Sequence, residues 1–182
     1  MPQGERDERG DRGWAQLFFS DEARLWTRVR GAFRLEPDIY AEIDRDPGSI
    51  PQAFLVVIGS AAVAGLSWSP YLMFLSIAGL LFAWLVAAAL IWAVASLMLR
   101  EEVDYARLLR CLGFAYVWVT PLLFSNLPLL IGSLITLGSI ALLFYSFLLA
   151  TRQVLSVPLE RAAAMCAIAT LLPIVLIWSL TR

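Results

Sequence analysis

The sequence predicts an all-α integral membrane protein, a bundle of five transmembrane helices with an N-terminal cytoplasmic amphipathic helix. Three observations predict this fold class. Hydrophobic residues make up 60% of the 182 residues and the mean hydropathy is +0.74, whereas soluble domains are about 45–50% apolar. Charged residues are missing from long stretches of the chain, and the arginines concentrate in the segments between alternate pairs of these stretches.

Composition divides the chain into three regions. Residues 1–13 are charged and glycine-rich and are predicted to form a disordered tail. Residues 14–49 are predicted to be a cytoplasmic amphipathic or interfacial segment, and residues 50–182 the five-span transmembrane domain. No apolar stretch follows a basic start in the tail, so we expect no secretory signal peptide.

An amphipathic helix is predicted to begin near Ser20, a suitable N-cap followed by two acids in the first turn. Apolar residues then recur on one face, with arginines at its edges or opposite, as in interfacial helices. The apolar residues are Leu25, Trp26, Val29, Ala32 and Phe33, and the basic ones are Arg24, Arg28, Arg30 and Arg34. We expect this helix to lie on its own membrane domain, with lipid-surface sensing and partner docking as alternatives.

The remaining elements follow from capping signals and uncharged runs. Pro37 is suited to open a short helix that continues to about Arg45, and Ser49 with Gln52 fits a capping box for the first span. Uncharged runs, each near or above the roughly 20 residues that a spanning helix needs, predict the spans. The runs are 50–68, 71–99, 111–151 and 162–180, and the third is split at the turn formers from Ser125 to Pro128. The predicted spans cover about 50–68, 71–99, 108–126, 128–150 and 160–180. Short connections predict antiparallel hairpins for the first two spans and for the third and fourth.

The arginines predict the orientation in the membrane. Eight lie before residue 50, three lie between the second and third spans, and two lie between the fourth and fifth. The two short hairpin connections hold none, so 13 of the 14 arginines share one side. The positive-inside rule then predicts a cell (inner) membrane protein with a cytoplasmic N-terminus and an exterior C-terminus.

Composition also argues against several function classes. The net charge of −1 and the lack of a basic stripe argue against nucleic acid as a partner. Histidine is absent from the sequence, and no ionisable residue lies deep in a predicted span, as proton relays and ion pathways require. Cys111 and Cys166 are expected to be small core residues. We therefore expect a protein that is not an enzyme, with no catalytic residues, cofactor or metal.

Two features are candidates for function. Acids and arginines near the membrane entrance predict a partner-docking surface over residues 36–46 and 100–110. Its candidate residues are Asp38, Glu42, Glu101, Glu102, Arg107 and Arg110. Pro121, about midway along the third span, predicts a helix kink because it lacks the N–H that would bond one turn back. A packing kink fits that prediction, and so does a hinge or a lipid-facing notch.

The order of features resembles the Yip1-domain family of multi-pass membrane proteins, in its bacterial type. An acidic segment, "LEPDIYAEIDRDPGSIPQAFLVV", leads into the spans, and the third span enters as "YARLLRCLGFAYVWVTPLLF". The residues that match the family pattern are Arg110, Gly113, Phe114, Ala115 and Pro121. The resemblance covers about residues 35–180 and implies five spans and a cytoplasmic N-terminus, but it supplies no catalytic residues.

Together these observations predict a non-enzymatic membrane protein that scaffolds or recruits a protein partner at the cytoplasmic membrane face. Membrane lipids are expected partners, and homo-oligomerisation stays open. One alternative is a small-solute or lipid transporter, or a subunit of one, gated by the third span. Another is an accessory subunit of a larger membrane complex, held by the tryptophans Trp84, Trp92, Trp118 and Trp178.

Overall fold

The computed structural model describes residues 22–66, 70–99 and 103–180, which form helices with short connections and no strand. The first helix is described over residues 22–33, and we call it the N-terminal helix. The others are α2 (Pro37–Arg45), α3 (Ser49–Gly65), α4 (Pro70–Leu99), α5 (Tyr105–Ala115), the 3-10 helix η2 (Tyr116–Phe124), α6 (Leu129–Leu155) and α7 (Leu159–Leu180). The all-helical prediction is confirmed, as is the short helix from Pro37 to Arg45.

Among the described residues, three helical segments are long and apolar enough to cross a membrane, judged by length and composition. They are Met73–Leu97 in α4, Tyr105–Phe124 across α5 and η2, and Leu130–Leu155 in α6. A further apolar helix, Ser49–Gly65, is shorter at 17 residues. These segments support a membrane protein, while the prediction of five spans rests on the sequence.

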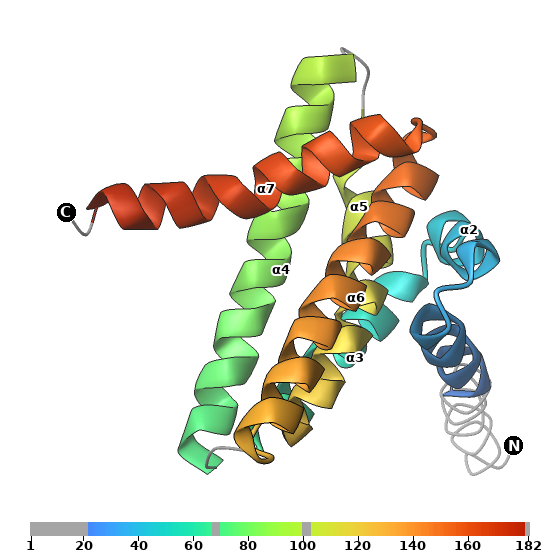
Figure 1. Ribbon diagram of the computed structural model, residues 1–182. Coiled ribbons are helices and arrows are strands. Elements are labelled where there is room, and N and C mark those ends of the chain that lie inside the picture. The colour runs from blue at the N-terminus through green and yellow to red at the C-terminus, as the bar shows by residue number, and fades with distance from the viewer. Residues whose placement is uncertain (1–21, 67–69, 100–102, 181–182) are drawn as a thin grey trace, which may run out of the picture.

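The helices pack as a bundle with two attachments (Figure 1). Within it α3 contacts α4, α5 and η2, while α6 contacts α5 and η2. The short helix α2 packs on one side, against α5 and α6. The last helix, α7, contacts α4 and α6, crosses α4, and extends beyond the other helices (Figure 1).

Helices α3 and α5 approach each other closely at Gly113. A Cβ atom placed on Gly113 would lie 2.6 Å from the Ala53 Cβ and 3.2 Å from a Trp84 ring carbon. Trp84 is itself buried, and its indole N–H donates to the Leu109 carbonyl oxygen at 3.1 Å. Glycine at 113 therefore lets α3, α4 and α5 meet at one point.

The third span changes its helix type partway along. It is α-helical to Ala115 and then 3-10 from Tyr116 to Phe124, with Pro121 inside the 3-10 segment. Pro121 has no N–H for the carbonyl one turn earlier, and in an α-helix its ring would clash with that carbonyl. Nine residues is long for a 3-10 helix, because runs of more than 3–4 residues are uncommon. The irregular geometry thus surrounds the residue for which the sequence predicted a kink.

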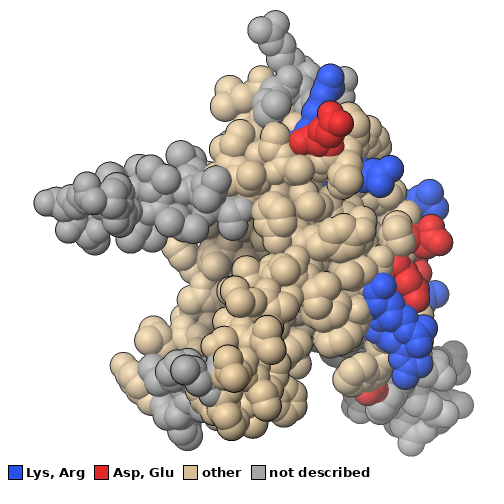
Figure 2. Space-filling model, viewed as in Figure 1, with Lys and Arg blue, Asp and Glu red and all other residues tan. Residues whose placement is uncertain are grey.

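Charge separates one edge of the molecule from the rest. In Figure 2, charged side chains gather along the top and the right-hand edge, where Figure 1 places α2, while the lower left is uncharged where it is described. Large apolar side chains are exposed elsewhere, including Phe74 and Phe82 on α4 and Leu130 and Leu134 on α6. Such an exposed apolar surface is what lipid would cover.

Candidate functional site

The right-hand part of the charged edge is built from the N-terminal helix, α2 and the turn after it, residues 22–48, which we call the platform. The chain turns between its two helices through a Schellman-type end: the Leu35 N–H donates to the Ala32 carbonyl and the Glu36 N–H to the Gly31 carbonyl, both at 3.1 Å. Leu35 takes the left-handed conformation, with φ of 58°. This sharp turn brings the second helix back against the first.

Two buried side chains of α2 attach the platform to the bundle. Tyr40 and Ile43 are fully buried in the same core as α5 and α6. The Tyr40 hydroxyl hydrogen-bonds the Ser146 hydroxyl on α6, and the Cys111 thiol donates to the Tyr40 carbonyl oxygen at 3.7 Å. Burial raises the pKa of Tyr40 to about 12, so this phenol stays neutral at physiological pH.

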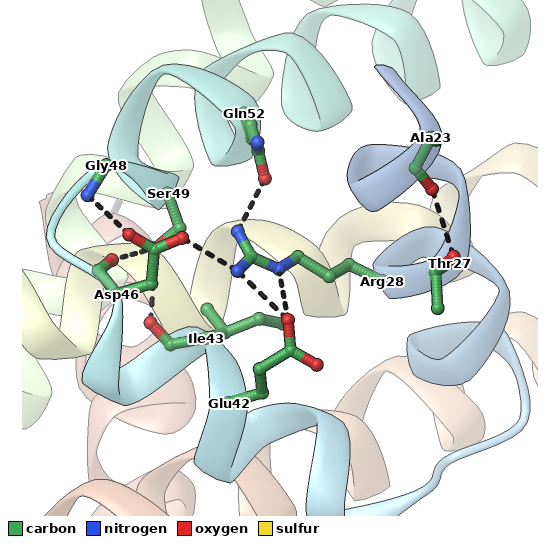
Figure 3. Close-up of polar contacts among 9 residues, drawn as sticks. All are labelled: Ala23, Thr27, Arg28, Glu42, Ile43, Asp46, Gly48, Ser49 and Gln52. Carbon is green, nitrogen blue, oxygen red and sulfur yellow. Dashed lines mark hydrogen bonds and ion pairs between the residues drawn. The ribbon is translucent and has the colours of Figure 1, made fainter. Parts of the chain in front are cut away.

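Arg28, on the N-terminal helix, binds side chains from α2, from the turn after α2 and from α3 (Figure 3). Its guanidinium donates to the Glu42 carboxylate at 3.1 and 3.0 Å, to the Asp46 carboxylate at 2.7 Å, and to the Gln52 side-chain oxygen at 2.7 Å. Only 2% of Arg28 is exposed. Because its partners lie on α2, the following turn and α3, this one cation ties the N-terminal helix to both neighbours.

The turn between α2 and α3 is closed by its own polar contacts. Asp46 accepts a hydrogen bond from the Gly48 N–H at 2.9 Å, and the Ser49 hydroxyl donates to the carbonyl oxygens of Ile43 and Asp46 at 3.1 and 2.7 Å (Figure 3). The predicted capping box of Ser49 and Gln52 is wrong, since Gln52 instead accepts from Arg28. The N-cap is Gly48, which makes no side-chain cap bond. A buried cation outcompetes a backbone N–H for the Gln52 oxygen.

A second ion pair joins α2 to the third span. The Arg107 guanidinium donates to the Asp44 carboxylate from two nitrogens, one at 2.7 Å. Asp44 is buried, whereas the Arg107 side chain is 41% exposed. A two-point pair of this kind fixes direction as well as distance, so it sets the orientation of α2 on α5.

The predicted docking residues have different environments. Asp38 and Glu42 are exposed on α2, although Glu42 also binds Arg28, and Arg107 binds Asp44. Arg110 is only 6% exposed, and its Nε has no hydrogen-bond partner among the described residues. Glu101 and Glu102 lie outside the described residues. Asp38 and Glu42 therefore lie together on the exposed side of α2, whereas Arg110 is buried in the bundle and is not part of the surface.

Four of the five residues of the family resemblance are buried in the third span, and Pro121 is half-buried. Gly113, Phe114 and Ala115 are buried in α5, beside Arg110, and Pro121 lies in η2.

The tryptophans predicted to hold a larger complex make internal contacts. Trp84 is buried, the Trp92 indole N–H donates to the Val103 carbonyl at 2.9 Å, and Trp118 stacks on Phe33 with ring centroids 4.4 Å apart. The side chain of Trp178 lies outside the described part of the chain. Trp92 also keeps an exposed surface, at 41%.

The buried position of Arg28 differs from the sequence prediction, which places this residue at an edge of the amphipathic helix or opposite its apolar face. The signal was present, because Leu25, Arg28, Val29 and Ala32 share one stripe at helical spacing. Leu25, Val29 and Ala32 pack on the core, whereas Trp26 and Phe33 are exposed. The predicted N-cap, Ser20, lies outside the described residues.

Acid should weaken the platform. Asp46 accepts hydrogen bonds from Arg28, and these hold the pKa of the Asp46 carboxyl below its usual value. Burial has a smaller effect in the opposite direction. A lowered pKa contributes stability above the unfolded pKa, and this contribution is lost as pH falls through the folded pKa. We expect the Tm of the solubilised protein to fall below about pH 5, and to fall less in Asp46→Asn. Asp38→Asn, at an exposed acid of α2, is the control and should follow the parent. If the dependence of Tm on pH were the same in Asp46→Asn and in the parent, the prediction would be wrong.

Comparison of the chain with protein-family models, with curated proteins and with solved structures finds no match.

Proposed function

We propose that this is a non-enzymatic, five-span membrane protein of the cell membrane, with a cytoplasmic N-terminus and an exterior C-terminus. The placement of 13 of 14 arginines in the predicted inner segments supports this topology. The uncharged run over residues 162–180, which follows Glu160 and Arg161, supports a fifth span. Membership of the Yip1-domain family, in its bacterial type, is part of the same proposal and rests on the sequence pattern alone.

The proposed activity is recruitment of a protein partner to the cytoplasmic face through the platform. The observation that carries it is the way Arg28 and Tyr40 fix α2 to the bundle while its outer face stays free. Asp38, Glu42 and Arg45 are exposed on that face. Charges on a fixed helix bind a partner at a lower entropic cost than charges on a mobile chain.

Site-directed photo-crosslinking in cells tests this function. A photoreactive amino acid at position 38 or 45 should crosslink one protein reproducibly, whereas the same group at Leu134, on an exposed apolar face of α6, should not. Asp38→Arg should abolish the crosslink formed from position 45. Asp38 is the sharper choice for charge reversal, because changing Glu42 would also disturb Arg28. No crosslink from either position, or one insensitive to Asp38→Arg, would contradict recruitment.

Transport of a small solute or lipid is a second candidate, favoured by a cavity beside the irregular helix. The cavity has a volume of about 480 Å³ and is lined by α3, α4, α6 and η2 residues, including Gly79, Val119 and Thr136. A Cβ on Gly79 would meet no atom within 4 Å, so Gly79→Leu should fill the cavity without a backbone clash. A substrate that raises the Tm of the parent but not of Gly79→Leu would favour transport over recruitment.

A further inference from the structure

An apolar groove lies between the N-terminal helix and the bundle, beside the contacts that join them. It has a volume of about 380 Å³, and its walls come from the N-terminal helix, α3 and η2. Trp26 and Phe33 form one side, and Leu55, Gly59 and Val63 follow one another along α3 on the other. No charged residue lines it. Its size falls in the range of ligand sites, about 300–1,000 Å³.

The groove runs from the charged edge toward the uncharged part of the bundle, as an acyl chain runs from its headgroup into the membrane. From Leu55 to Val63 the α3 axis advances about 12 Å. These residues follow the platform end of α3, where Gln52 binds Arg28, so the groove leads from the charged edge toward uncharged parts of the helix. Trp26 and Phe33 are 65% and 42% exposed. Exposed aromatic residues beside a charged edge are typical of the headgroup level of a membrane.

Two arginines stand beside the mouth of this groove. A second depression, of about 600 Å³, shares Trp26, Val29 and Phe33 with the groove and is also lined by Arg30 and Arg34. Arg30 forms no ion pair with any residue that the structure describes. Arg34 has Glu36 at 3.7 Å and is exposed. Unlike Arg28, whose donors bind protein acceptors, these guanidinium groups are available to an anion.

We propose that the groove binds one acyl chain of an anionic phospholipid, whose phosphate is held by Arg30 and Arg34. Charge complementarity selects this occupant: the groove is apolar along its length, and cations flank the side that lies at the charged edge. Guanidinium groups bind phosphate through paired, charge-assisted hydrogen bonds. The proposal is independent of partner recruitment, since it concerns the apolar side of the N-terminal helix and not the outer face of α2.

The test uses the full-length protein in mild detergent, with phosphatidylglycerol and phosphatidylcholine of the same acyl chains as probes. Native mass spectrometry and thermal unfolding report binding. We expect phosphatidylglycerol to bind and raise the Tm, and phosphatidylcholine to do so more weakly. The double variant R30Q/R34Q should weaken phosphatidylglycerol binding by at least about tenfold, because the loss of even one charged hydrogen bond costs on that order. Arg45→Gln, an exposed arginine on α2, is its control.

Filling the groove provides a second, independent variant. A Cβ on Gly59 meets no atom within 4 Å, so Gly59→Leu should fold and occupy the groove. It should abolish the lipid-dependent rise in Tm, whereas Gly138→Leu, at an equally open site on α6, should keep it. Equal effects of both lipids, or unchanged binding in R30Q/R34Q and Gly59→Leu, would overturn the proposal. So would binding that appears only after residues 1–21 are removed, because the chain itself would then fill the groove.

Discussion

Arg28→Met is expected to lower the free energy of unfolding by about 3 kcal/mol, the low end of the range for removing one partner of a buried ion pair. The substitution keeps much of the apolar stem but leaves Glu42, Asp46 and Gln52 without their shared donor. The loss is at the low end because Glu42 and Asp46 are partly exposed to water. Equilibrium unfolding in mixed detergent micelles measures it.

Arg24→Met supplies the matched control, since Arg24 is an exposed arginine one helical turn earlier. It should change stability by less than about 0.5 kcal/mol, as surface substitutions usually do. If Arg28→Met were as mild as Arg24→Met, the buried network would not hold the platform.

Gly113→Val is expected to be the most damaging single change in the bundle core. Its new side chain would overlap the Ala53 methyl group and press on Trp84, so α3 and α5 would have to separate. Overpacking of a close-packed core costs about 1–3 kcal/mol, and occasionally more. Here the contact also reaches the Ala53 backbone at 3.3 Å, which cannot turn aside as a side chain can. We expect a loss of at least about 3 kcal/mol, seen as a lower unfolding midpoint and poor recovery from the membrane.

Gly138→Val controls for helix propensity and for the loss of glycine, because a Cβ at Gly138 meets no atom within 4 Å. Valine there should be tolerated. Should both variants be tolerated equally, the close approach of α3 and α5 at Gly113 would be ruled out.

The helices could be predicted from the sequence because their signals are local. Uncharged runs, Pro37 and the short connections mark helix positions without any knowledge of tertiary contacts. The expected ends differ from the structure by a few residues, as with the fourth span, predicted to end near residue 150 and observed as a helix to Leu155. Helix ends depend on caps and neighbours, which hydropathy does not contain.

The partners of the polar residues could not be predicted, because they are set by helix packing. The position of Arg28 on the apolar stripe could have indicated burial, but nothing local indicates that its acceptors lie 14 to 24 residues away. Likewise, Ser49 and Gln52 have capping-box spacing, yet the fold gives each a different partner. For Pro121, the missing N–H predicted an irregular helix but not that the irregularity would begin at Tyr116.

Hydrogen–deuterium exchange in lipid nanodiscs tests most directly whether the platform is a rigid part of the bundle. Our account predicts that the amides of α2, Pro37–Arg45, exchange as slowly as those of α5, and that Arg28→Met speeds exchange in α2 and the N-terminal helix while leaving α5 protected. Exchange of the α2 amides at the rate of an unstructured peptide in the unmodified protein would contradict it.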